Sequence, residues 1–456
     1  MTTGKKPVVT PKTTDKKTPY AHIPEKHLCQ MVIDITPMVT DIESTITFGY
    51  KKGRYIPDLT AKDVRTKAEI HHALLKYETT KNILVDPPMI NGTYSYLKTM
   101  TCQPIESWRN RYNNYINVKN GLLDIETWEL IPHSSAIFTT HMLNVEYKPE
   151  VGYDDYEIYI KTMFNDNDIN NIQELEGNII APHYVAKKIL LVYGEGNTGK
   201  TTHFLIFQSM IGKSNCSNLG LTQMHMANNL IGIYDKVGNI SYEIPSGING
   251  SDGSLLKSLS GNDPITLRPL YKAPFYPISR AKLYFCGNII PKFKQDCLDD
   301  AFLDRWCPIH CNNTFALNSG FIDKMTTPDM LSQQFNWLIE GYKRLKSNNW
   351  AISNPMSTDD IRELFEQSIV TEFDKWFSNC CRSDPTGWVS TDALFGSYLR
   401  WCIIKRVSNK PTKTSFGISI NNQELFSGVK KERKIFKGAL GVEYRVYGYT
   451  GLILDA

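Results

Sequence analysis

The stretch Ile189-Leu-Leu-Val-Tyr-Gly-Glu-Gly-Asn-Thr-Gly-Lys-Thr-Thr202 decides the fold. Residues 189–193 form a short apolar β-type run, and residues 202–210 have the character of a helix. Between them lies G-x-x-x-x-G-K-T, in the strand–loop–helix context that a phosphate-binding loop requires. The glycines let backbone N–H groups turn inward around phosphate oxygens, and the following helix presents its positive end to the same anion. We therefore expect an α/β nucleotide-binding domain.

The loop supplies the predicted nucleotide-binding residues. They are Gly194, Glu195, Gly196, Asn197, Thr198, Gly199, Lys200, Thr201 and Thr202. Lys200 can bridge the β- and γ-phosphates and Thr201 can ligate Mg²⁺, so ATP and Mg²⁺ are the expected cofactors. The loop alone does not define the reaction, because kinases, GTPases and motors share it.

Three downstream residues complete the predicted catalytic set. Glu243 ends a partly apolar run, where an acidic group could hold Mg²⁺ and polarise the attacking water. Asn288 ends a second run and could position that water. Arg305 follows a short helical turn, and its forked guanidinium matches phosphate. At a subunit interface it could stabilise the transition state at a neighbour's nucleotide. The ordinary alternatives are a surface glutamate, a turn asparagine and an arginine paired with Asp304.

A hairpin is expected between these residues. Gly261–Pro264 has turn chemistry, residues 265–268 alternate as a strand, residues 271–277 form a tip, and residues 281–286 return. Lys272 beside aromatic residues suits contact with single-stranded DNA, and Arg268 and Lys257 are further DNA-binding candidates. In isolation, the same segment is an ordinary polar loop.

The composition is that of a globular chain. It has 456 residues, 41% of them hydrophobic and 21% charged, enough for two to four domains. Lys and Arg number 51 against 47 Asp and Glu, so the net charge of +4 says little about partners.

The ten cysteines include no CxxC pair. The chain also shows neither a signal-type apolar segment nor an apolar run of membrane-spanning length. These patterns predict reduced thiols, a cytoplasmic location and no membrane partner. Cys307, His310 and Cys311 lack a second ligand pair nearby, so buried strand thiols are expected rather than a zinc site.

Four segments are predicted along the chain: a flexible basic tail at 1–18, an α+β accessory domain at 19–150, the motor at 151–350 and a DNA-binding domain at 351–456. In the accessory domain, residues 62–77 read as a helix and residues 115–130 as a hairpin turning at Asn120-Gly121. Residues 108–111 are expected on a solvated helix face, and Asp166-Asn-Asp168 at a helix start rather than in a metal site.

The C-terminal segment is basic. Residues 371–456 carry 13 Lys and Arg against 8 Asp and Glu. A helix is expected to start at residues 357–360, and further helices at 370–381 and 392–404. Residues 443–449 then alternate as a hairpin strand. Helices followed by a basic hairpin suggest a winged helix.

The order of these motifs resembles the superfamily 3 helicases, and in particular the helicase half of phage, plasmid and poxvirus primase–helicases. Leu256-Lys257-x-Leu-x-Gly261-x-Asp263 and Cys286-Gly-Asn288-x-x-Pro291 carry the resemblance in the motor. Asn117–Asp124 with Pro132-His133 resembles the family's domain before the motor, and residues 394–452 resemble its terminal winged helix.

The resemblance implies an AAA+-like motor: a central parallel sheet with helices on both faces, assembling as a ring, commonly a hexamer. It implies that Lys200, Thr201 and Glu243 serve one subunit's ATP site, with Asn288 as sensor. Arg305 would reach in from the neighbour, and Lys272 would follow single-stranded DNA in the pore. Duplex DNA at the winged helix and a replication initiator, primase or polymerase are further expected partners. With about 150 residues before the motor, a complete primase domain is not expected.

Three functions follow from these motifs. The favoured one is an ATP-dependent replicative DNA helicase of a mobile genetic element. The alternative is a DNA-stimulated ATPase that acts as an initiator or loader and unwinds little. A nucleotide kinase or GTPase is disfavoured, because a kinase lid needs several arginines near the loop and residues 211–240 contain none.

Overall fold

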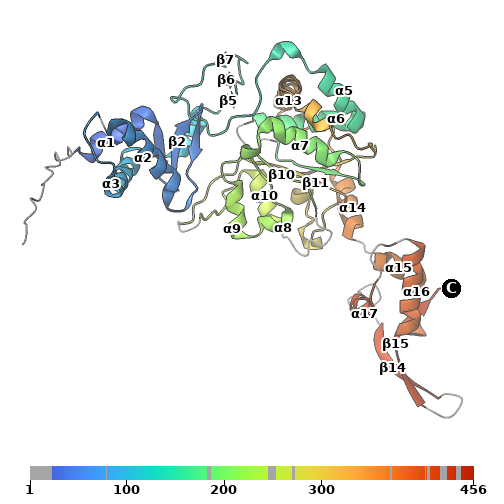
Figure 1. Cartoon of the computed structure of the whole chain (residues 1–456). Coiled ribbons are helices and arrows are strands. Elements are labelled where there is room, and N and C mark those ends of the chain that lie inside the picture. The colour runs from blue at the N-terminus through green and yellow to red at the C-terminus, as the bar shows by residue number, and fades with distance from the viewer. Residues whose placement is uncertain are drawn as a thin grey trace, which may run out of the picture. The chain divides into compact units, whose positions relative to one another are not determined.

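The computed structural model describes residues 23–78, 80–181, 186–244, 253–269, 273–369, 372–405, 407, 411–421, 429–437 and 443–455. These residues form two compact units (Figure 1). The first contains the described residues up to Met356 except 290–298, and the second contains 290–298 and the chain from Ser357 onward. The predicted tail at 1–18 lies outside the described residues, and the domain divisions at 150 and 350 stay predictions.

The first unit is built on a five-stranded parallel sheet in the order β12-β8-β11-β10-β9. Its strands are β8 (Ile189–Tyr193), β9 (Cys216–Ser217), β10 (Gly238–Ser241), β11 (Lys282–Gly287) and β12 (Trp306–His310). The predicted strand at 189–193 is thus confirmed. It is the most apolar of the five, as expected for a central parallel strand covered on both faces.

Helices pack on both faces of this sheet. Alternating side chains of β11 point to opposite faces: Tyr284 contacts Phe207 of α7, while Phe285 contacts Trp306, which packs on Phe302 of α11. The helices of this region are α5 (Asp154–Met163), α6 (Asp166–Gly177), α7 (Lys200–Ile211), α8 (Leu221–Met224), α9 (Ala227–Leu230), α10 (Ser254–Gly261), α11 (Asp300–Leu303), α12 (Phe321–Met325) and α13 (Pro328–Ser347). The predicted helix at 202–210 and the helix start at 166 are confirmed.

The N-terminal part of the first unit is α+β. Its helices are α1 (Glu25–Ile35), α2 (Val64–Glu78), α3 (Pro87–Met100) and α4 (Ile105–Arg111). One sheet has the order β3-β2-β1-β4, from β1 (Met38–Asp41), β2 (Thr47–Lys51), β3 (Arg54–Pro57) and β4 (Cys102–Gln103). Another contains β5 (Tyr115–Val118), β6 (Gly121–Asp124) and β7 (Leu130–Ile131). The predicted hairpin exists, but Val118 pairs with Gly121, so its loop is Lys119–Asn120, one residue earlier than expected.

The second unit joins helices to an antiparallel sheet of order β13-β15-β14. Its elements are α14 (Thr358–Ile369), α15 (Glu372–Cys380), α16 (Thr391–Ile404), α17 (Lys413–Asn421), β13 (Cys381–Ser390), β14 (Lys430–Lys437) and β15 (Glu443–Leu454). Its core includes the buried aromatic residues Phe373, Trp376 and Phe416. The expected helices and terminal strand are confirmed, and the winged-helix assignment stays a prediction.

Short 3₁₀ turns complete the secondary structure: η1 (Ala61–Asp63), η2 (Pro149–Val151), η3 (Asn178–Ile180), η4 (Lys213–Asn215), η5 (Ile231–Ile233) and η6 (Gln295–Cys297). All ten cysteines are free thiols, and Cys307 and Cys311 are buried, as the sequence suggests. The described residues contain no cluster of metal-ligating side chains. Within them, no helix combines the length and apolar character needed to cross a membrane.

Candidate nucleotide site

The loop between β8 and α7 has the backbone that its glycines predict. Gly194, Asn197 and Gly199 have positive φ angles of 149°, 64° and 78°. A Cβ at Gly194 would collide with the carbonyl oxygen of Cys311, so only glycine fits there. Gly199 is the N-cap of α7, a 12-residue helix. The first N–H groups of such a helix have no acceptor within it, which suits an anion at this end.

Lys200 lies inside this loop. Its side chain is buried, and its ammonium donates to Gly194 O at 2.8 Å, Glu195 O at 2.6 Å and Thr198 Oγ1 at 2.8 Å. No carboxylate in the described ranges forms an ion pair with it. Burial lowers the pKa of Lys200 because the charged form loses hydration. A buried cation held only by neutral oxygens favours an anionic ligand, so the loop fits a nucleotide phosphate.

The segment after β12 holds the loop in place. Cys311 N donates to Tyr193 O at 2.8 Å and Phe315 N donates to Asn197 O at 2.9 Å. The rings of Tyr193 and His310 stack with centroids 4.7 Å apart. Sequence reasoning missed this support, because residues 310–315 are more than 100 positions from the loop and carry no motif.

Asn288 lies beside the loop. It directly follows β11, and the pairing of Gly287 with Tyr193 brings Asn288 opposite Gly194. Its side chain is exposed. Asn288 therefore lies next to the residues that the sequence predicts to bind phosphate.

Glu243 lies at the same edge of the sheet. It follows β10 by two residues, is exposed, and is next to Ile244, which packs against Gly287 at the end of β11. Because β8, β11 and β10 are parallel neighbours, their carboxyl ends share one edge. Two strand spacings separate β10 from β8 by roughly 10 Å. Exposed Thr201, which follows Lys200, and Glu243 therefore lie at the same edge of the sheet.

Arg305 lies at the opposite edge. It precedes Trp306, which pairs with Ile189, the first residue of β8. One Nη group donates to Ala301 O. The five residues of β8 span about 16 Å, so Arg305 does not reach the phosphate loop of its own chain. Any contact of Arg305 with a nucleotide would have to be with that of another subunit.

The predicted DNA-binding residues have different surroundings. Lys257 on α10 pairs with Asp299 at 2.8 Å, whereas Arg268 is exposed. Lys272 lies outside the described residues. Leu267 and Phe275 exchange backbone hydrogen bonds of 3.0 and 2.9 Å, so a hairpin is present. Its second arm is residues 275–278, and the expected returning strand at 281–286 is instead β11 of the parallel sheet.

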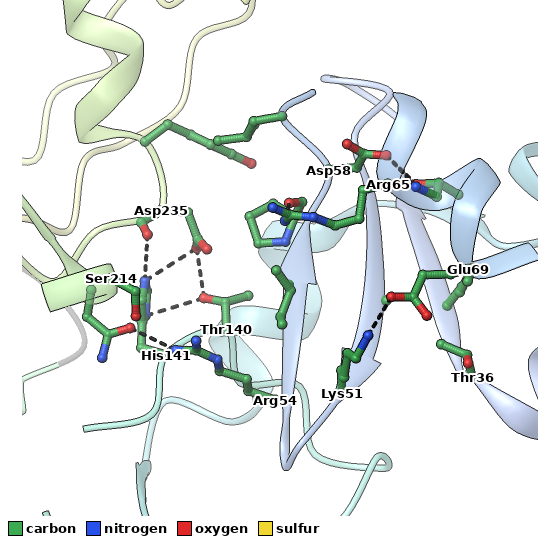
Figure 2. A pocket seen from close by; sticks show the side chains of 18 of the residues that line it. Thr36, Lys51, Arg54, Asp58, Arg65, Glu69, Thr140, His141, Ser214 and Asp235 are labelled. Atoms are coloured by element: carbon green, nitrogen blue, oxygen red, sulfur yellow. Dashed lines mark hydrogen bonds and ion pairs between the residues drawn. The ribbon is translucent and has the colours of Figure 1, made fainter. Parts of the chain in front are cut away.

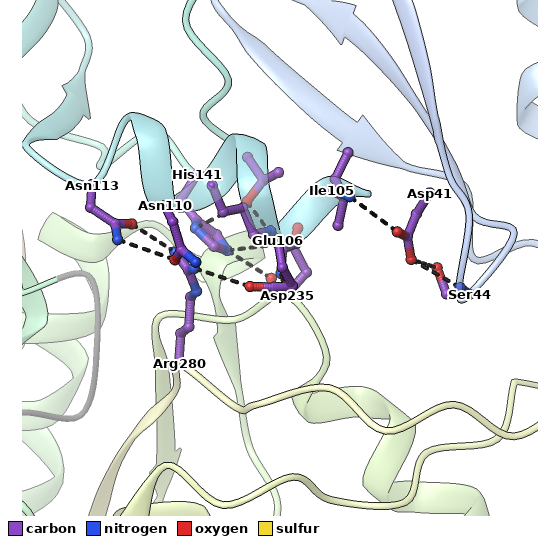
Figure 3. Close-up of polar contacts among 11 residues, drawn as sticks. Asp41, Ser44, Ile105, Glu106, Asn110, Asn113, His141, Asp235 and Arg280 are labelled. Atoms are coloured by element: carbon purple, nitrogen blue, oxygen red, sulfur yellow. Dashed lines mark hydrogen bonds and ion pairs between the residues drawn. The ribbon is translucent and has the colours of Figure 1, made fainter. Parts of the chain in front are cut away.

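A polar cluster that the sequence did not reveal connects α4 to Arg280, which follows the second arm of this hairpin (Figure 3). Arg109 is buried and pairs with Asp235 at 2.8 Å, so the predicted solvated helix face is wrong for this residue. Arg280 contacts Glu106 at 3.4 Å, and His141 Nε2 donates to Asp235 O at 2.9 Å. Burial acts to raise the pKa of Asp235, but His141 and Arg109 outweigh it and lower that pKa.

Two family profiles match the chain. Residues 53–173 match the family described as D5 N terminal like. Residues 192–301 match a family of unknown function, DUF5906. The second match covers the phosphate loop, Glu243, the hairpin and Asn288.

Solved structures of the NrS-1 C terminal region are similar to this chain over most of its length. Its A form apo structure has 11% identity and a TM-score of 0.45, covering 93% of this chain and 98% of that one. A second apo structure of the region has 12% identity and a TM-score of 0.46, covering 92% and 97%. The comparison with curated proteins found no match.

Proposed function

We propose that this chain is an ATP-driven DNA motor of the primase–helicase type, acting as a replicative helicase of a mobile genetic element. One observation carries the proposal: Lys200 is buried within its loop, held only by loop oxygens, at the edge where β10 and β11 also end. The match of residues 53–173 to the D5 N terminal like family agrees with an accessory domain before the motor.

The proposed site stabilises a triphosphate through the chain's own groups. Lys200 and the first N–H groups of α7 would bind the β- and γ-phosphate oxygens, and Thr201 and Glu243 would hold Mg²⁺, directly or through water. Bound there, Mg²⁺ neutralises charge on the phosphate oxygens. Glu243 would accept a hydrogen bond from the attacking water and Asn288 would orient it.

The opposite position of Arg305 supports an assembly of several subunits. A guanidinium that cannot reach the loop of its own chain can complete the site of a neighbour, as in a closed ring. We propose the hexamer that the resemblance implies.

Two basic hairpins support DNA as the substrate. The hairpin of residues 264–278 presents exposed Arg268. Lys272, which the sequence predicts at the hairpin tip, lies outside the described residues. Lys257 is a weaker candidate, because Asp299 already neutralises it. In the second unit, β14 is exposed along its length and carries Lys430, Lys431, Arg433, Lys434 and Lys437. This surface suits duplex phosphates, as the winged-helix assignment requires.

The test is ATP-dependent unwinding of forked DNA by the full chain. Lys200→Ala should abolish both hydrolysis and unwinding, whereas Lys272→Ala should retain most hydrolysis and lose unwinding. The control is Lys62→Ala, which removes an exposed lysine of the N-terminal part, outside the predicted motor. Normal unwinding by Lys272→Ala would contradict the pore assignment. DNA-stimulated hydrolysis without unwinding by the wild type would instead favour an initiator or loader.

A further inference from the structure

A second candidate binding site lies at the sheet edge opposite the phosphate loop. A cavity of about 490 Å³ opens there (Figure 2). Its lining comes from three distant segments: residues 36–69 of the N-terminal part, residues 140–141, and residues 214–236. Ser214 and Asn215 precede β9, and residues 234–236 precede β10, so the cavity is at the amino ends of these strands.

A tight hairpin positions the cavity's first cation. Lys51 pairs with Arg54 across the two-residue turn Lys52–Gly53, and both turn residues have positive φ angles, 48° and 81°. Gly53 lies against the side chains of Met142 and His133. Arg54 then donates from Nη1 to Asn215 Oδ1 at 2.9 Å.

The side chains that line the cavity carry more positive than negative charge. Lys236 Nζ donates to Ser214 O at 2.6 Å and Arg65 Nη1 to Pro57 O at 2.7 Å. In the described part of the chain, neither these two cations nor Arg54 forms an ion pair.

The acidic groups of the lining are already engaged. Asp235 pairs with Arg109 at 2.8 Å, and Glu69 pairs with Lys51 at 2.8 Å. Asp58 accepts hydrogen bonds from the backbone and hydroxyl of Thr66, each at 2.7 Å. Asp235 also attracts Arg54 and Lys236. Counted over the whole lining, four lysine and arginine side chains face three carboxylates, so one positive charge is in excess.

Arg54 and Lys236 are the two cations of the lining that we consider as ligands of an anion. Burial lowers the pKa of each side chain, and the nearby Asp235 offsets part of this decrease in both. Arg54 adds a smaller decrease to the pKa of Lys236. Two like charges held together and half-desolvated attract an anion, preferably one with two charges. A phosphate group meets this need, since it accepts from the arginine fork and from an ammonium at once.

The lining also contains an apolar part, formed by Met38, Ile56, Pro57 and Leu59. The volume lies in the range of roughly 300–1,000 Å³ that is typical of small-molecule pockets. We propose that this cavity binds a phosphate-bearing small molecule of nucleotide size, with its phosphate between Arg54 and Lys236 and its uncharged part against Ile56 and Leu59. This site is separate from the phosphate loop and goes beyond the motor function proposed above.

The experiment is calorimetric titration of the full chain with AMP, dTMP and inorganic phosphate. Monophosphates lack the β- and γ-phosphates that Lys200 would bind. The double variant Arg54→Gln/Lys236→Gln should weaken monophosphate binding at least tenfold, the equivalent of about 1.4 kcal/mol. Lys52→Gln removes the same charge from the same hairpin outside the lining and should change the affinity less than twofold. Arg54→Lys should retain most of the binding.

Three results would overturn the site: no monophosphate binding by the wild type at millimolar concentration, equal binding by the double variant, or binding that disappears in Lys200→Ala. The third result would assign the binding to the phosphate loop. A dT₂₀ oligonucleotide serves as a further probe. If its affinity falls in the double variant while monophosphates do not bind, the occupant is a nucleic-acid backbone and the small-molecule assignment is wrong. If thermal melting shows the double variant to be unfolded, the single variant Lys236→Gln replaces it under the same criteria.

Discussion

The two edges of the parallel sheet hold cations in contrasting ways. At the carboxyl edge, Lys200 donates to its own loop, beside a helix N-terminus and a backbone shaped by positive φ angles. At the amino edge, Lys282 donates to Ala181 O at 2.5 Å and Arg305 to Ala301 O, with no comparable loop around them. A basic side chain that donates to carbonyl groups is thus common to both edges. The loop and helix terminus, which can exchange those bonds for a phosphate, distinguish the candidate nucleotide site.

The largest expected effect is at Lys200. Lys200→Ala should reduce DNA-stimulated ATP hydrolysis by about 10³-fold or more, because the phosphate loses a charged donor within a desolvated site. Lys188→Ala is the matched control at the amino edge, where the ammonium donates to Asp304 O, and its rate should stay within about twofold. Phosphate-release kinetics measures both. Equal losses in the two variants would remove the contrast between the edges.

Glu243 should affect the chemical step more than binding. Glu243→Gln keeps the size of the side chain but removes the carboxylate, so hydrolysis should fall by about 10²-fold or more while ATP affinity changes little. Single-turnover hydrolysis and equilibrium binding separate the two quantities. Glu340→Gln, at an exposed position of α13, should leave both unchanged. A loss of affinity without a loss of rate would exclude the proposed role in polarising water.

Variants of Arg305 test whether this residue of one subunit acts at the nucleotide site of a neighbouring subunit. Arg305→Ala and Lys200→Ala should each be inactive alone, but mixing them should restore activity. In random rings, roughly one interface in four then joins an intact Lys200 to an intact Arg305. Hydrolysis should therefore recover to about a quarter of the wild-type rate. A mixture as inactive as its components would contradict the role of Arg305 between subunits.

Contiguous patterns made the phosphate loop predictable from sequence. Ile189–Tyr193, the glycines and Lys200 are adjacent, so local chemistry alone specifies the strand, the turn and the helix start. The residues after β11 and β10 could be proposed because parallel strands bring their carboxyl ends together. The pairing of β11 within the parallel sheet could not be predicted. The alternating residues of β11 suit a hairpin strand and a strand of a parallel sheet equally.

Long-range pairs limited the remaining predictions. Arg109 was assigned to a solvated face because Asp235, its partner, is 126 positions away. The hydrogen bond from Phe315 to the phosphate loop and the cavity around Arg54 could not be predicted for the same reason. Each combines segments that carry no motif by themselves. Burial and pairing of this kind depend on the tertiary fold and not on local propensity.

The smallest expected effect is on stability, at Lys282. This lysine is buried, and burial, with a smaller contribution from Arg280, lowers its pKa to about 7. Between pH 7 and its ordinary pKa of 10.5, the unfolded chain holds a proton that the folded chain releases. The free energy of unfolding therefore rises with pH across this window, and the penalty is complete below pH 7.

Lys282→Met should remove that pH dependence. The variant should be more stable than the wild type near pH 7, by on the order of 1 kcal/mol, because the lost hydrogen bond to Ala181 O offsets part of the gain. The difference should shrink as the pH rises toward 10. Urea unfolding at pH 7, 8.5 and 10 measures it, with the exposed Lys26→Met as control. A stability difference that does not vary with pH would mean that Lys282 remains charged in the folded protein. Lys200 and Lys282 would then differ only in the loop and helix terminus that surround Lys200.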